Sequence, residues 1–191
     1  FNKEFKQIGG KETDTKKKLA VKIDYLKDKV TQKETQAIRI VRRFREYRER
    51  FLETPSIWPV YGRILSHYGW RIHPKSGRTQ FHKGVDIPSW IGAPIKGTAN
   101  GVVEFAGWGG GYGWLIILEH KHGYRTLYAH LSEIMVTTGS YIKKGQIIGK
   151  LGESGNTTGP HIHYEIRRWR RSMQPKYYLG LDLFTAITQV W

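Results

Sequence analysis

Apolar residues recur on a heptad between Leu19 and Phe51, and this pattern limits what the first part of the chain can fold into. Two heptad positions carry the apolar side chains: Ile23, Val30, Ala37, Phe44 and Phe51 on one, and Leu19, Leu26, Ile40 and Tyr47 on the other, with Lys33 as the single break. The spacing predicts a long helix with coiled-coil character. We expect it to end at the Thr54–Pro55 step, because the residue before a proline avoids the helical region.

A helix of this length would extend about 50 Å at 1.5 Å per residue, too far to be buried within a small domain. We therefore expect residues 19–54 to pack on another helix, from a partner, a regulator or an upstream part of the protein. The alternative is a single amphipathic helix that lies on the rest of the chain. Either way, residues 1–54 are expected to form a helical arm and residues 55–191 a separate domain.

From Trp58 onward the chain changes to short segments rich in Val, Ile, Tyr and Trp and separated by glycine. The segments GVVEFAGW and GWLIILEH flank the run Gly109–Gly113, and GYRTLYAHL, YIKKGQIIGKLG and HIHYEIRRW follow at similar intervals. The pattern predicts a mainly β, antiparallel domain with a hairpin around the glycine run. Because no helix is expected to follow the glycines, we interpret them as a turn rather than as a phosphate-binding loop.

Composition sets wider limits. The 191 residues, 39% of them hydrophobic, suffice for one compact domain and an appendage. No apolar run approaches the ~18 residues of a membrane span, and no signal-peptide core is visible. Since the chain opens at Phe1 rather than Met, an upstream targeting segment or membrane anchor stays open. The absence of cysteine excludes disulfides and thiolate metal sites, so any metal must be held by histidine and carboxylate.

The formal charge of +16 indicates affinity for polyanions in general, whether nucleic acid, anionic lipid or cell-wall polymer. A solvated basic surface is the favoured interpretation, because no RNP, KH or zinc-finger signature accompanies the charge. No nucleic-acid partner is therefore expected. The basic, aromatic stretch RRWRRSMQPKYYL near the end of the chain is interpreted in the same way.

Histidines form the candidate site. In TTGPHIHYEI, His161 and His163 lie one residue apart on an expected strand, so both side chains project from the same face. FHKGVDIP places His82 four residues before Asp86, and LYAHL places His130 in another expected strand. Histidine and carboxylate without cysteine suit a zinc site with two histidines, one aspartate and an open fourth position, which is typical of catalytic zinc. Spacing alone does not decide which member of the pair, His161 or His163, is the ligand.

These motifs resemble a known family. SHYGWRIHPKSGRTQFHKGVDIP, LYAHL and GNTTGPHIHYEI are similar, in this order and spacing, to lysostaphin/LytM-type zinc endopeptidases, which cut peptide bridges or stems of bacterial peptidoglycan. The similarity runs from about Trp58 to about Leu179. It implies a groove of antiparallel strands in which one zinc per chain is held by His82, Asp86 and His163, with His130 and His161 as non-ligand catalytic histidines.

The resemblance also implies a reaction, in which a zinc-activated water attacks a peptide carbonyl while His130 and His161 move protons and stabilise the oxyanion. His73 occupies the position where some family members have an oxyanion-assisting tyrosine, so it is a possible secondary site residue. The other histidines, His67, His120 and His122, match no site position and are expected at the surface or in turns.

Three functions from different classes follow. The first is an endopeptidase of the bacterial cell envelope, periplasmic or otherwise extracytoplasmic, that opens stem-peptide cross-links of peptidoglycan. The second is a non-catalytic relative that binds the wall or activates another hydrolase through its coiled coil. The third is a basic scaffold or nucleic-acid binder. Because every ligand and catalytic position of the family pattern is occupied in this chain, the first is favoured.

Overall fold

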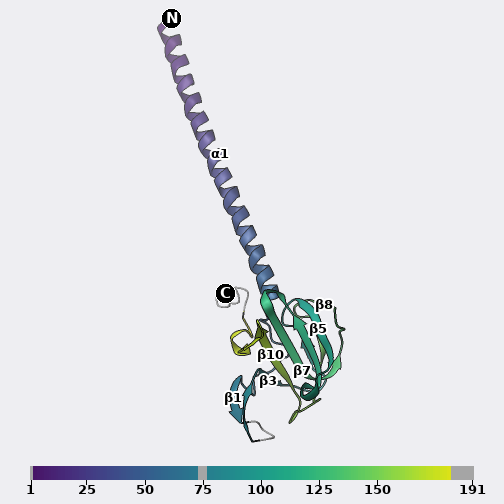
Figure 1. Cartoon of the computed structure of the whole chain (residues 1–191). Helices are drawn as coiled ribbons and strands as arrows, with labels where there is room; N and C mark the ends of the chain where they lie inside the picture. The colour runs from purple at the N-terminus through teal and green to yellow at the C-terminus, as the bar shows by residue number, and fades with distance from the viewer. Residues whose placement is uncertain (1, 73–76, 182–191) are drawn as a thin grey trace. The chain divides into compact units, whose positions relative to one another are not determined.

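The computed structural model of the chain describes residues 2–72 and 77–181 (Figure 1). The chain divides between Glu46 and Tyr47 into two compact units, the first helical and the second containing the strands. The predicted division at residues 54 and 55 thus lies about two helical turns beyond the division in the structure, and the assignment of residues 55–191 as an endopeptidase domain stays a prediction.

The helix α1 (Asn2–Glu53) is continuous over 52 residues. Its end directly before the Thr54–Pro55 step confirms the predicted stop, but it begins well before Leu19. The preceding residues are rich in Lys, with two Glu, and both residue types are good helix formers, so the helix extends beyond the apolar repeat that predicted it. No helix in the described ranges has a stretch both long and apolar enough to cross a membrane.

The strands of the second unit pair antiparallel throughout the described residues, which confirms the expected mainly β fold preceded by a long helix. They are β1 (Gly69–Ile72), β2 (Thr79–His82), β3 (Val85–Pro88), β4 (Pro94–Lys96), β5 (Gly101–Trp108), β6 (Trp114–Glu119), β7 (Tyr124–Ile134), β8 (Tyr141–Ile142), β9 (Ile147–Leu151), β10 (His161–Arg168) and β11 (Arg171–Met173). β1 and β2 form a separate two-stranded sheet, and the other strands form the main sheet.

Strand β10 lies inside the main sheet and has neighbouring strands along both edges. It pairs with β7 along one edge, and with β3 and then β11 along the other; Figure 1 shows β3, β10 and β7 side by side. Ile162, Tyr164 and Ile166 point from one face of β10 into the core and are fully buried. The intervening residues, beginning with His161 and His163, project from the opposite face. The alternation therefore separates core from candidate site along a single strand.

His120 is buried, so of its two expected positions the structure excludes the surface; the residue directly precedes the short helical turn Lys121–Gly123. Its ring bridges the carbonyl of Asn100, 2.7 Å from Nδ1, and the Thr126 hydroxyl, 2.7 Å from Nε2. The hydroxyls of Thr126, Tyr128, Thr98 and Tyr164 continue the network through the core. Burial lowers the pKa of His120 to about 4, so the imidazole is neutral at pH 7 and its polar atoms are satisfied inside the fold.

The last turn of α1 is bonded to the strand-bearing unit, to which it belongs. The Glu53 carboxylate lies 2.6 Å from Lys121 Nζ and 3.0 Å from His122 Nε2. Lys144 Nζ donates to the carbonyls of Phe51 and Thr54, at 2.6 and 3.1 Å, and burial lowers the pKa of Lys144 to about 7. The helix terminus is thus a fixed part of this unit.

Candidate metal centre

The candidate centre lies where β3 meets β10. Asp86 and His163 are direct cross-strand neighbours, so their side chains project from the same face of the sheet. His82 ends β2, and Lys83 and Gly84 lead into β3. A side chain at position 84 would place its Cβ 2.3 Å from the Tyr164 carbonyl oxygen, so glycine alone allows the turn that brings His82 back to Asp86.

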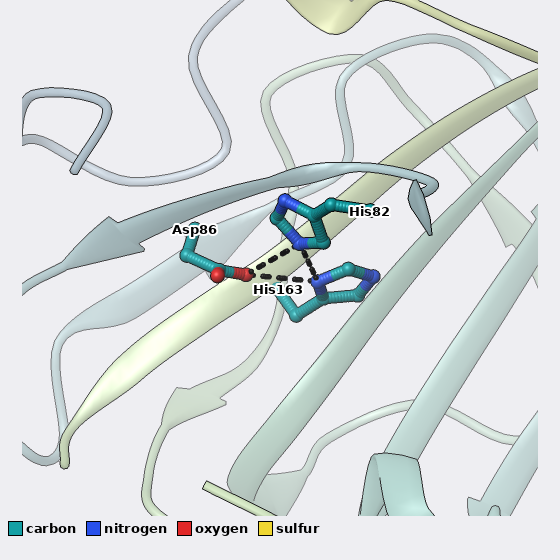
Figure 2. Close-up of side chains that lie close together, drawn as sticks. All are labelled: His82, Asp86 and His163. Atoms are coloured by element: carbon teal, nitrogen blue, oxygen red, sulfur yellow. Dashed lines mark hydrogen bonds and ion pairs between the residues drawn. The ribbon is translucent and has the colours of Figure 1, made fainter. Parts of the chain in front are cut away.

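Three donor atoms converge at this centre, as Figure 2 shows. The His82 Nε2 atom lies 3.0 Å from His163 Nδ1, and the Asp86 Oδ1 atom lies 3.1 Å from the first nitrogen and 2.8 Å from the second. Zinc bonds of about 2.0–2.1 Å at tetrahedral angles would separate ligand atoms by roughly 3.3 Å. The triangle of donors therefore has nearly the size that a tetrahedral metal site requires.

The outward hydrogen bonds of the His82 and His163 rings determine which nitrogen of each ring carries the proton and which lone pair faces the centre. His82 Nδ1 lies 2.9 Å from the His67 carbonyl oxygen and His163 Nε2 lies 3.1 Å from Glu165 Oε1, and both are acceptors only. The ring protons are thus donated outward, and two nitrogen lone pairs and a carboxylate oxygen meet in a buried space. Such an electron-rich set fits a cation, so the residues present suit the zinc implied by the sequence.

The pKa values of Asp86 and His163 also reflect the excess of electron-rich groups at the centre. Burial acts to raise the pKa of Asp86, but hydrogen bonds and charge from His163 and His82 outweigh it and hold that pKa well below its usual value. Burial acts to lower the pKa of His163, whereas the hydrogen bonds to Asp86 and Glu165 raise it to about 8. The two carboxylates thus favour a positive charge between them.

His130 reaches the site through an irregularity of β7. Ala129 lies opposite His163, so regular alternation would turn His130 to the other face of the sheet. Instead, the register between β6 and β7 shifts at this point, and His130 has a φ of 62°, in the left-handed region that non-glycine residues rarely occupy. The resulting bulge places the His130 ring 4.9 Å from that of His161 and 6.1 Å from that of His163.

His161 and His130 are both tied to backbone carbonyls by Nδ1, at 2.8 Å to Gly159 and 2.7 Å to Ser154. Each therefore keeps Nε2 as its basic nitrogen, and the Nε2 of His161 lies 3.7 Å from Asp86 Oδ1. Burial lowers the pKa of His130 to about 4. Both rings line a groove of about 760 Å³ together with His82, Asp86 and His163.

Of the eight histidines, the groove thus contains the four named with Asp86 as site residues. His73 lies outside the described residues. His67 is exposed and contributes only its carbonyl, and His122 bonds to Glu53 away from the groove. Sequence reasoning missed Glu165, which also lines the groove, as does Tyr112 of the aromatic, glycine-rich hairpin. For Glu165 a signal existed, because it follows His163 by two residues on the same face of the strand.

Comparison with known proteins agrees with this geometry. Residues 80–175 match the family described as Peptidase family M23. A protein of Neisseria meningitidis named DD-carboxypeptidase/endopeptidase Mpg is 43% identical over 108 residues, covering 56% of this chain and 25% of that protein. The peptidoglycan DD-endopeptidase ShyC of Vibrio cholerae is 37% identical over 123 residues, covering 64% of this chain and 28% of that protein. The chain thus spans about a quarter of the length of these relatives.

Solved structures give the same result. A zinc-containing peptidase from Vibrio cholerae superposes with a TM-score of 0.59 at 35% identity, covering 64% of this chain and 39% of that one. The catalytic domain of lysostaphin from Staphylococcus simulans superposes with a TM-score of 0.52 at 34% identity, covering 61% and 86%. The fold, the arrangement of the histidines and the sequence match over half of its residues agree with the resemblance seen in the sequence, and the chain belongs to peptidase family M23.

Proposed function

We propose that this protein is a zinc-dependent endopeptidase of the bacterial cell envelope that hydrolyses peptide cross-links of peptidoglycan. The observation that carries the proposal is the convergence of His82, Asp86 and His163 donors within 3.1 Å, next to two further histidines in one groove. The names of two relatives, both described as acting as endopeptidases, support the reaction class. They also support the envelope as the location, because ShyC is named for peptidoglycan.

His82, Asp86 and His163 would hold the zinc, which when bound supplies a Lewis acid that lowers the pKa of water to about 7. Hydrolysis of a peptide bond also requires that a proton leave the attacking water and reach the departing amine. The Nε2 atoms of His130 and His161 are suited to both transfers, because each ring is oriented by its Nδ1 bond to a carbonyl. Whichever of the two is protonated can donate a hydrogen bond to the developing oxyanion.

A second candidate function has one observation in its favour. The murein hydrolase activator EnvC of Escherichia coli is 34% identical over 125 residues, so relatives of this chain include a protein named as an activator. The candidate is disfavoured because all five predicted site positions carry the required residues in this chain. An activator would have no use for a second pair of oriented histidines beside the metal donors.

Substrate choice tests the proposal directly. We expect the purified chain to cleave soluble stem-peptide dimers joined by a D-alanyl cross-link, and a chelator to stop the reaction. Mass analysis of the fragments, with pentaglycine digested side by side, identifies the bond. Cleavage of pentaglycine alone would refute the cross-link assignment, and a zinc-loaded protein inert on both would favour the activator.

The charge of +16 adds a second expectation for the same reaction. Activity on intact sacculi should fall as salt rises, because screening weakens attraction to an anionic wall. Activity on the soluble dimer should fall less. Equal salt dependence on both substrates would show that the basic surface does not hold the enzyme at the wall.

We also propose that residues 19–44 of α1 bind a separate, acidic helix. The heptad side chains of this segment are exposed, among them Leu26, Val30 and Phe44 at 52%, 56% and 64%. In a parallel dimer, the heptad positions next to the apolar ones of the two copies face each other. Lys22 of one copy would then lie opposite Lys27 of the other, and Arg43 opposite Arg48. The pair Lys29 and Glu34 would be attractive. Like charges therefore disfavour a second copy, whereas glutamates on a partner would complement this surface.

We expect the chain alone to sediment as a monomer at micromolar concentration and to bind a heptad peptide that has Ile and Leu in its seam and Glu at the flanking positions. The same peptide with Lys at those positions is the control and should not bind. A stable dimer of the chain, or equal binding of the two peptides, would contradict the proposal.

A further inference from the structure

The four histidines of the groove differ in what holds the nitrogen that points away from its centre. Three rings donate to neutral backbone carbonyls, which belong to His67, Ser154 and Gly159. Among these four rings, only His163 directs its outward nitrogen to a charged side chain, with Nε2 3.1 Å from Oε1 of Glu165. This difference sets His163 apart from the other candidate ligand histidine, His82.

Glu165 is unusually well held for a carboxylate. It is fully buried, and its Oε1 atom also accepts a hydrogen bond of 2.8 Å from the Tyr112 hydroxyl. Its Oε2 atom accepts from Nε of Arg167, at 2.8 Å, and lies 2.7 Å from a terminal nitrogen of the same guanidinium, so both oxygens of the carboxylate have charged or polar partners. His163, Glu165 and Arg167 are alternate residues of β10, so they form one continuous row on the groove face.

Tyr112 is brought to this row by the glycine run between β5 and β6. Gly110 and Gly113 have φ values of 62° and 64°, and a Cβ at Gly113 would lie 2.4 Å from the backbone of Ser154. Only glycine allows this close approach in the left-handed region. The loop interpreted from the sequence as a simple turn therefore has a second task, because its short helical turn, Gly110–Tyr112, directs a phenol onto Glu165.

We propose that Glu165 is the positioning residue of the metal centre, that it acts through His163, and that Tyr112 and Arg167 hold it for this task. This inference rests on the proposed metal site. A carboxylate that accepts the Nε2 proton fixes the ring orientation and the tautomer, and it strengthens Nδ1 as a donor to a metal. Because both oxygens of Glu165 are occupied, it is not a free base for the reaction.

The test is zinc affinity, measured by competition with a chromogenic chelator. We expect Glu165→Gln to bind zinc about 10- to 100-fold more weakly than the unchanged chain, the range found for partners of ligating histidines. Glu133→Gln is the matched control, because Glu133 is an exposed carboxylate that pairs with Lys150, and it should leave the affinity unchanged. Unchanged zinc affinity in a folded Glu165→Gln variant would overturn the proposal, even if peptidase activity were lost.

Tyr112→Phe provides a second variant that keeps the carboxylate and removes one hydrogen bond from it. We expect zinc affinity to fall a few-fold, and the effect to vanish when Glu165→Gln is already present, because the two residues act in series. If Glu165→Gln does not fold, an unchanged affinity in Tyr112→Phe overturns the proposal on its own. Failure of the unchanged chain to bind zinc would instead overturn the proposed function.

Discussion

We expect the purified protein to lose zinc when any one of His82, Asp86 and His163 is replaced by alanine. A structural zinc site of four ligands binds with roughly 10–16 kcal/mol, so one ligand carries about 3 kcal/mol, more than a hundredfold in affinity. We expect metal analysis after gel filtration to find close to one zinc per unchanged chain and far less in each variant. Peptidase activity should be lost in parallel.

His67→Ala is the matched control for these variants. The His67 side chain is exposed, and the substitution keeps the backbone carbonyl that receives the His82 ring proton. Its zinc content should equal that of the unchanged chain. Full zinc in all three ligand variants would show that the metal, if present, is bound elsewhere.

The second large effect separates catalysis from metal binding. We expect His130→Ala and His161→Ala to retain zinc but to lose activity by about a hundredfold to a thousandfold, because proton transfer and oxyanion stabilisation contribute on this scale. Single-turnover cleavage of the cross-linked dimer, with metal content determined on the same sample, measures both properties together.

The metal content and activity of these variants test the role of each histidine. Loss of metal in His161→Ala with retention in His163→Ala would reverse their assignment. Full activity in either His130→Ala or His161→Ala would reduce that residue to a structural role. The distances favour the present assignment, because His163 Nδ1 lies 2.8 Å from Asp86 Oδ1 and His161 Nε2 lies 3.7 Å from it.

The structural features that depend on local periodicity were predicted correctly from the sequence. Alternation on β10 put His161 and His163 on one face, and the heptad and the Thr54–Pro55 step defined the helix end, because both patterns depend on neighbours in the chain. The same alternation, applied to β7, would turn His130 to the wrong face, and only the bulge opposite Leu115 restores it. A bulge depends on how two strands pair, and the residue pattern of one strand does not predict that pairing.

The remaining gaps have the same physical origin. Burial of His120 depends on hydrogen-bond partners from Asn100 and Thr126, and the role of Tyr112 depends on a loop that meets β10 across the sheet. Such contacts depend on how strands and loops meet in the folded protein, so composition and spacing could not predict them. The identity of the site residues came instead from resemblance to a family, which carries this long-range information.

The bonded last turn of α1 determines where this protein can be cut and rejoined. A fragment that begins at Pro55 lacks the Phe51 and Thr54 carbonyls that accept hydrogen bonds from Lys144 Nζ, and the Leu52 carbonyl that accepts one from the Asn100 amide. Each group left without its acceptor costs about 1–3 kcal/mol where water cannot replace it. Fragments for crystallisation, or chimaeras that attach the strand-bearing unit to a different helix, should therefore be joined ahead of Tyr47, in register with the heptad.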